Sequence, residues 1–127
     1  MILVYKVLAS LLYPILFLLT YYRKIINKED ALRYKEKILV SHYRAIQKGS
    51  SKLIWFHAAS IGEFKSIIPI INQLNLNHQN LKFLITTNTL SSANLAEIEL
   101  KKIKNAQHRY MPYDVPYLID KFLHLWK

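Results

Sequence analysis

The sequence predicts an α/β protein: an N-terminal apolar helix, then half of a doubly wound parallel sheet made of three strand-helix units. Two observations lead to this prediction. Residues 1–22 carry a single charged side chain, although the chain as a whole has a formal net charge of +10. From residue 53 onward, short apolar runs alternate with amphipathic segments at a spacing of about 27 residues, which is typical of parallel strands joined by crossover helices.

The first element is a membrane anchor over residues 1–22. As a helix, this segment would extend about 33 Å, close to the roughly 30 Å of a bilayer's hydrocarbon core. Tyr21 and Tyr22 suit the membrane interface, and Lys6 is close enough to the helix end to reach head groups. A cleaved signal peptide is the alternative, but the segment lacks a positively charged start and a small-residue cleavage site. An uncleaved anchor, spanning the bilayer or lying in its interface, is therefore expected.

Residues 23–52 predict a basic helical connector. They hold nine basic residues against three acidic ones. Basic residues beside a membrane anchor indicate the cytoplasmic side and attraction to anionic lipids, worth about 1 kcal/mol each. Nucleic-acid binding is the competing use of such charge, but the segment contains no recognised nucleic-acid motif. We therefore expect membrane lipid and no nucleic acid as a partner.

Residues 53–127 contain the three strand-helix units. The expected strands are 53–59, 81–85 and 108–111; the expected helices run over 63–75, from an N-cap at Ser91 or Ser92 to about 104, and from Pro116 after a capping Asp114. Because such crossovers are right-handed, the three strand-to-helix turns open on one edge of the sheet. Open α/β sheets bind their ligands at that edge.

The first of these turns holds the leading candidate for chemistry. After the apolar strand the side chains become small, and Gly62 permits a tight turn. Glu63 comes next, in the first turn of a helix, where negative charge is favoured. The residues alone leave two interpretations open: Glu63 is a general base, or it only complements the helix dipole.

The turn also carries a family resemblance. His57, Ala58, Ser60, Gly62 and Glu63 match a His-Ala-x-Ser-x-Gly-Glu pattern, and LITTNTLSSA at 84–93 and HRYMPYDVP at 108–116 agree with the same family in order and spacing. Together they resemble the N-terminal part of the Kdo (3-deoxy-D-manno-octulosonic acid) transferases, which attach Kdo to the lipid A precursor. The resemblance implies a Rossmann-like acceptor-side domain of GT-B type over 53–127 and a role in lipopolysaccharide biosynthesis at the inner membrane.

The resemblance also implies a mechanism. Glu63 would be the proton acceptor in an inverting transfer, with CMP-Kdo as the donor substrate and with no metal and no cofactor. The candidates for binding the acceptor are polar or small residues at the ends of the first two strands: Ser60, Gly62, Lys65, Thr86, Thr87 and Asn88. Each has a plainer alternative, because Ser60 and Gly62 can serve only the turn, Lys65 can be solvated, and hydroxyl-rich turns are common. The five histidines show no paired metal spacing, and His57 is interpreted as a hydrogen-bonding residue at a strand end.

Members of the family continue beyond the third helix with another strand, a Met-Glu-Thr-Glu segment and a second Rossmann-like domain that binds the donor. The sequence ends at Lys127, before these parts. We therefore expect an N-terminal fragment that is inactive alone, with a separately encoded C-terminal donor-binding half as a possible partner and with an exposed edge on the first strand. The alternative is a small, basic, membrane-anchored interaction protein without catalysis.

Overall fold

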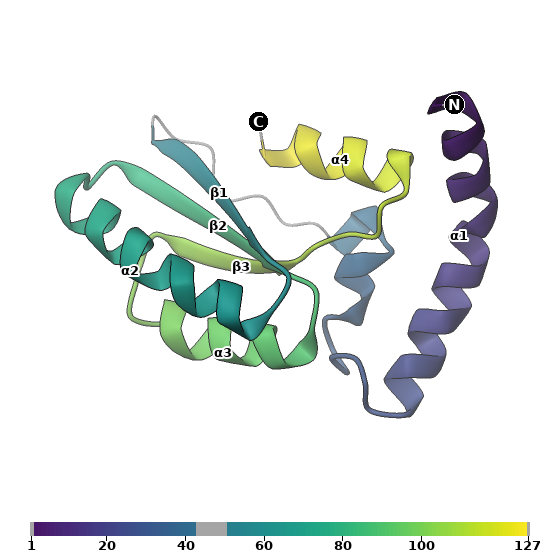
Figure 1. Cartoon of the computed structure of the whole chain (residues 1–127), viewed down its shortest axis with the longest axis horizontal. Helices are drawn as coiled ribbons and strands as arrows, with labels where there is room; N and C mark the ends of the chain where they lie inside the picture. The colour runs from purple at the N-terminus through teal and green to yellow at the C-terminus, as the bar shows by residue number, and fades with distance from the viewer. Residues whose placement is uncertain (1, 43–50, 127) are drawn as a thin grey trace. The chain divides into compact units, whose positions relative to one another are not determined.

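The computed structural model describes residues 2–42 and 51–126 (Figure 1). The helices and strands are, in order, α1 (Ile2–Ile25), η1 (Tyr34–Lys37), η2 (Val40–His42), β1 (Lys52–Ala58), α2 (Ile61–Asn77), β2 (Leu81–Thr87), α3 (Leu90–Leu100), β3 (Ala106–Tyr110) and α4 (Pro116–Trp126), where η marks a short 3₁₀-helix. The chain forms two compact units, which we call the sheet unit (46–111) and the anchor unit (1–45 with 112–127).

The sheet unit is a parallel three-stranded sheet in the order β1-β2-β3. Ala58 pairs with Thr87, and Thr87 pairs with Tyr110, so the carboxyl ends of all three strands lie at one edge. The predicted α/β fold with parallel strands is thereby confirmed. The edge expected to bind ligands is formed by the turns that come directly after these strands.

Helices α2 and α3 lie side by side on one face of the sheet (Figure 1). Two right-handed crossovers that step in the same direction place both helices on the same side. Phe64 and Ile71 of α2 and Phe83 and Ile85 of β2 are fully buried between these layers. Each such side chain contributes roughly 1.5–3 kcal/mol by leaving water, so this apolar layer fixes where the turns at the carboxyl edge lie.

The helix boundaries differ from the expected ones for a local reason. The side chain of Thr89 accepts a hydrogen bond from the N–H of Ser92 at 3.2 Å, which makes Thr89 the N-cap of α3 instead of Ser91 or Ser92. The helix consequently begins at Leu90, and it ends at Leu100 instead of near residue 104. Helix α2 likewise begins at Ile61, two residues before the expected start, because Ser60 is its N-cap.

The anchor unit begins with the apolar helix α1, which extends beyond the expected residues 1–22 to Ile25. Asn27 ends it with a φ of 55°, and the N–H groups of Asn27 and Lys28 bond back to Lys24 and Arg23, as in a Schellman motif. The chain from there to residue 42 consists of turns and the two 3₁₀-helices, whereas the sequence predicted a helical connector over 23–52. Residues 43–50 of that connector lie outside the described residues.

Helix α4 belongs to the anchor unit by its contacts, which it makes with α1 and η2. The sequence placed this helix in a single domain over 53–127. The difference arises because the segment before α4 bonds to the anchor unit: the N–H of Tyr113 donates to the carbonyl of Lys37, and the hydroxyl of Tyr5 donates to the carbonyl of Asp114.

Candidate functional site

The turn between β1 and α2 is held by a reciprocal pair of hydrogen bonds. Ser60 is extended, with φ −130° and ψ 164°, and its Oγ accepts the N–H of Glu63 at 3.2 Å. In return, Oε2 of Glu63 accepts the N–H of Ala59 at 2.8 Å. This arrangement is similar to a capping box, in which a Ser at the N-cap and a Glu three residues later satisfy each other's backbone donors. It orients the Glu63 carboxylate at the carboxyl end of β1.

The Glu63 side chain is exposed, and only one of its oxygens is used by the cap. In the described part of the chain, Oε1 has no hydrogen-bond partner. Glu63 therefore does complement the start of the helix, as the plainer interpretation had it. The same bond fixes the carboxylate and leaves a second oxygen facing solvent, which is what a positioned general base requires.

Gly62 does not have the special dihedrals that the sequence analysis assigned to it, since no glycine in the described residues has a positive φ. A Cβ built on Gly62 would meet only Oγ of Ser60, at 3.9 Å, an ordinary contact. Neither backbone conformation nor packing within the described chain requires a glycine here. The backbone at the start of α2 is consequently open to an approaching molecule.

The two threonines at the end of β2 point to opposite faces of the sheet. Thr87 is buried on the helix-covered face, where its hydroxyl lies 2.9 Å from Nε2 of His108. Thr86 is buried on the other face, where its Oγ1 lies 2.9 Å from Nε1 of Trp55 and 3.0 Å from Nδ1 of His57. The structure therefore gives these neighbouring residues different surroundings, although the sequence grouped them as acceptor-binding candidates.

The remaining candidates are on the surface. Asn88 is exposed directly after β2, at the same edge as the Ser60–Glu63 turn. Lys65 is exposed on α2, and it forms no ion pair within the described ranges. Of the predicted residues, Ser60, Gly62 and Glu63 thus form one turn, and Asn88 lies at the neighbouring strand end.

Trp55 is the residue that sequence reasoning missed. Its indole N–H reaches Thr86, and His57 reaches the same hydroxyl from the adjacent position on the same face of β1. A signal for this cluster existed in the sequence. Residues 55 and 57 alternate along the first strand with residues that face the core, so they share the other face of the sheet. The neighbouring parallel strand ends in Thr-Thr, which places a hydroxyl next to them. The interpretation of His57 as a strand-end hydrogen-bonding residue is confirmed.

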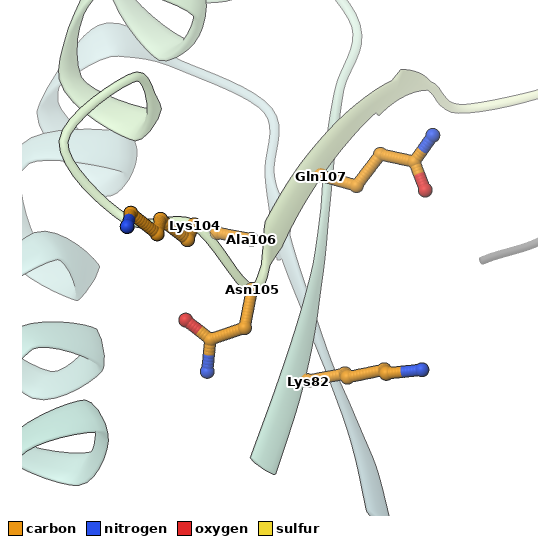
Figure 2. A pocket seen from close by; sticks show the side chains of 5 residues that line it. All are labelled: Lys82, Lys104, Asn105, Ala106 and Gln107. Atoms are coloured by element: carbon orange, nitrogen blue, oxygen red, sulfur yellow. The ribbon is translucent and has the colours of Figure 1, made fainter. Parts of the chain in front are cut away.

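A shallow hollow of about 340 Å³ lies at the opposite end of the sheet unit. It is lined by Lys82, Lys104, Asn105, Ala106 and Gln107. Figure 2 shows that these side chains point in different directions and do not converge on one point. The amide of Asn105 is also used internally, as a donor to the carbonyl of Leu81. This hollow lies at the amino ends of β2 and β3, away from the edge where parallel sheets bind ligands.

The parallel sheet covered by α2 and α3 defines the class, an α/β domain, and the exposed carboxylate of Glu63 at its carboxyl edge is the candidate site. The family model described as "3-Deoxy-D-manno-octulosonic-acid transferase (kdotransferase)" matches residues 32–127. The chain belongs to this family of glycosyltransferases.

Individual relatives agree with the family. The chain is 35% identical over 123 residues to the 3-deoxy-D-manno-octulosonic acid transferase of Rickettsia bellii, covering 97% of this chain and 28% of that protein. It is 34% identical over 127 residues to a probable mitochondrial 3-deoxy-D-manno-octulosonic acid transferase of Arabidopsis thaliana, covering 98% of this chain and 27% of that protein. The chain thus spans under a third of the length of these two relatives. No solved structure matches it.

Proposed function

We propose that this chain is the acceptor side of an enzyme that transfers Kdo from CMP-Kdo to lipid IVA, the lipid A precursor, in lipopolysaccharide biosynthesis. The family supports the reaction class, and the matched segment includes the whole β1-to-α2 turn. Because the chain spans 28% of the Rickettsia bellii relative, the donor-binding half is supplied by further protein. In this proposal, the substrates meet over the carboxyl edge of the sheet unit.

The reaction assigned to this edge is a direct displacement. An acceptor hydroxyl forms a bond to the anomeric carbon of Kdo while its proton passes to a carboxylate oxygen of Glu63. The bond from that carbon to the phosphate oxygen of CMP breaks, and CMP leaves with the electron pair. The chemistry requires a base within hydrogen-bond reach of the hydroxyl, and Glu63 is the carboxylate that this turn offers for that role.

The observation that carries the proposal is that the two carboxylate oxygens of Glu63 have different surroundings. Oε2 is held at 2.8 Å by the N–H of Ala59, and Oε1 faces solvent. A mobile surface glutamate would lose side-chain entropy on each turnover, whereas this carboxylate is already ordered. The predicted acceptor-binding residues Ser60 and Gly62 lie in the same turn.

The test uses a chimera in which residues 1–127 replace the corresponding part of the Rickettsia bellii relative. Glu63→Gln preserves the shape and the Ala59 hydrogen bond but removes the base, so transfer of Kdo should fall by roughly 10²–10⁴-fold. Activity is measured as Kdo transfer from CMP-Kdo to lipid IVA. The matched control is Glu99→Gln, because Glu99 forms only an exposed pair with Lys102 at 3.2 Å. Near-normal turnover by Glu63→Gln would reject the catalytic role and leave helix capping as its function.

We also propose that α1 holds the protein at the cytoplasmic face of the inner membrane. Residues 3–25 are long and apolar enough to cross a bilayer, and only 6% of an 18-residue window within them is buried. This low burial argues against a core helix of a soluble protein. The basic residues that come after α1 favour the cytoplasmic side.

Within this proposal, α1 lies in the membrane interface and does not span the bilayer. The hydroxyls of Tyr5 and Tyr13 donate to the carbonyls of Asp114 and Ile38. Thr20 gives its proton to the carbonyl of Leu16 in its own helix and accepts a hydrogen bond from the hydroxyl of Tyr113. All these partners belong to the anchor unit. Tyr5, Tyr13 and Thr20 lie eight and seven residues apart, which keeps them on one face of the helix.

The opposite face of α1 is apolar and open. Leu3, Leu11 and Leu18 are 75%, 68% and 67% exposed, and each precedes one of the three hydrogen-bonding residues by two positions. Two positions on a helix correspond to about 200°, so this row points away from the anchor unit. A helix with one bonded face and one apolar face is suited to lying in the interface plane.

A protease-protection experiment distinguishes a helix that lies in the membrane interface from one that spans the bilayer. With an epitope tag before residue 1, inside-out inner-membrane vesicles should lose the tag to external protease, and right-side-out spheroplasts should retain it. A tag after residue 127 serves as the control, because both orientations leave it on the cytoplasmic side. Digestion of the N-terminal tag in spheroplasts would show a spanning helix.

A further inference from the structure

The face of the sheet opposite α2 and α3 carries a three-residue hydrogen-bonded cluster, Trp55-Thr86-His57. The Thr86 hydroxyl is fully buried, and it lies 2.9 Å from the indole nitrogen of Trp55 and 3.0 Å from Nδ1 of His57. The backbone register places His57 directly opposite Thr86, at the end of β1 and three residues before Ser60. The cluster therefore borders the turn that holds Glu63.

The positions of the protons in this cluster are set by what each group can donate. The indole N–H of Trp55 is a donor only, so Thr86 Oγ1 accepts it. The hydroxyl then has one proton of its own, which can go to Nδ1 of His57 at 3.0 Å or to the carbonyl of Phe56 at 3.5 Å. The shorter bond is the better one, because hydrogen bonds weaken beyond about 3.2 Å. When Nδ1 accepts this hydroxyl proton, the neutral ring carries its own proton on Nε2.

The ring of His57 is thereby fixed while its other nitrogen stays available. The side chain is exposed, and Nε2 has no partner in the described part of the chain. Two further donors follow four and five residues along the chain, since the first N–H groups of α2, at Ile61 and Gly62, have no partner within the same described residues. The open space above Gly62 adjoins them.

We propose that His57 binds a phosphate group of the acceptor through its Nε2–H, with Trp55 and Thr86 as positioning residues. This inference rests on the proposed function, in which the acceptor is a phosphorylated glycolipid. A phosphate oxygen suits this donor because a charged acceptor makes the stronger hydrogen bond. His57 contacts the substrate in this assignment, and Glu63 alone takes the proton.

The first test is spectroscopic and needs no catalysis. The protein of 127 residues, with ¹⁵N-labelled histidine, is placed in detergent micelles at about pH 8.5, well above the pH at which an ordinary histidine titrates. The ¹⁵N shifts of His57, assigned by their loss in His57→Gln, should report the Nε2–H tautomer. Adding inorganic phosphate should shift the Nε2 resonance saturably, and chloride at equal ionic strength should not.

Variants of Thr86 and Thr87 distinguish a loss of the positioning of His57 from a general loss of folding. Thr86→Val keeps the shape of the buried side chain but removes the hydroxyl, so His57 should lose its single tautomer and phosphate binding should weaken by about tenfold. Thr86→Ser restores the hydroxyl and should restore both readouts. Thr87→Val is the matched control, because Thr87 bonds His108 on the other face and its loss should leave the His57 spectrum unchanged. An Nδ1–H tautomer, or no response to phosphate, would overturn the proposal.

The second test uses the chimera, so that failure of this inference is distinguishable from failure of the proposed function. His57→Ala should raise the KM for lipid IVA by about tenfold with little change in kcat, and His57→Gln, which keeps an N–H donor near the position of Nε2, should recover most of it. A chimera that transfers Kdo with an unchanged KM in His57→Ala would reject only the role of His57. A chimera without transfer, with phosphate binding at His57 intact, would reject only the proposed function.

Discussion

At the scale of single residues, Glu63 uses one carboxylate oxygen in a cap and keeps the other without a partner in the described part of the chain. Its Oε2 completes the cap of α2, and the same bond orders the carboxylate at the carboxyl edge of the sheet. The sequence indicated both interpretations and offered them as alternatives. The geometry makes them compatible, because a carboxylate has two oxygens and the cap uses only one. Gly62, between the two capping residues, is the position whose residue type neither the cap nor the packing explains.

Changing Gly62→Ala should therefore stabilise the protein and weaken its function. The new methyl group meets nothing closer than 3.9 Å, and alanine is favoured over glycine in a helix by about 0.5–1 kcal/mol, with the first turn at the lower end. If the open space admits the acceptor, the same methyl group should raise the KM for lipid IVA in the chimera. Thermal unfolding and steady-state kinetics measure the two effects. A more stable variant with unchanged KM would remove Gly62 from the acceptor site.

At the scale of elements, the basic segment behind α1 is less available to lipid than its composition indicated. Glu29 accepts from Arg23 at 2.8 Å and also pairs with Lys37, and its side chain is only 2% exposed. Arg33 forms a two-pronged pair with Glu36. In the part of this segment that the structure describes, Arg23, Arg33 and Lys37 are thus paired with acids of the same segment. The segment folds back into turns because these pairs hold it, which residue counting does not reveal.

Removing one partner of the buried Glu29–Lys37 pair should lower the free energy of unfolding much more than replacing both partners with apolar residues. Glu29→Gln leaves the ammonium of Lys37, 6% exposed, without its carboxylate, and the free energy of unfolding should fall by about 3–5 kcal/mol. The double change Glu29→Leu with Lys37→Met should recover most of that loss. The exposed Glu99→Gln, measured in the same denaturant series, should change stability by less than about 1 kcal/mol. Equal effects of Glu29→Gln and Glu99→Gln would show that burial does not strengthen the Glu29 pair.

Whether a feature could be predicted from the sequence depends on how far apart in the chain its interacting residues lie. The three parallel strands and the position of Glu63 could be predicted from local apolar runs and from a short motif. The cap at Thr89 was missed because three hydroxyl residues, Thr89, Ser91 and Ser92, compete within one turn. The place of α4 depends on contacts with α1 and η2, which no local pattern encodes. The Trp55-Thr86-His57 cluster also joins distant segments, and only the alternation of residues along β1 indicated it.

At the scale of the whole molecule, the sheet unit has an open edge at β1. Among the described strands, β1 pairs only with β2, and its Trp55 is 40% exposed. An unpaired, partly apolar edge next to the Ser60–Glu63 turn can pair with another strand. Because the chain covers 28% of the Rickettsia bellii transferase, the remainder of such a protein supplies both a donor site and further strands in our proposal.

A protein consisting of residues 1–127 alone should therefore bind phosphate but transfer no Kdo. Catalysis by proximity needs both substrates in register, and the candidate residues found here all belong to the acceptor side. Transfer from CMP-Kdo to lipid IVA should appear only when the donor half of a relative is fused to the chain or co-expressed with it. The fused chimera carrying Glu63→Gln is the control that separates true complementation from activity brought by the added half. Robust transfer by residues 1–127 alone would overturn the division into acceptor and donor halves and would place a donor site within this chain.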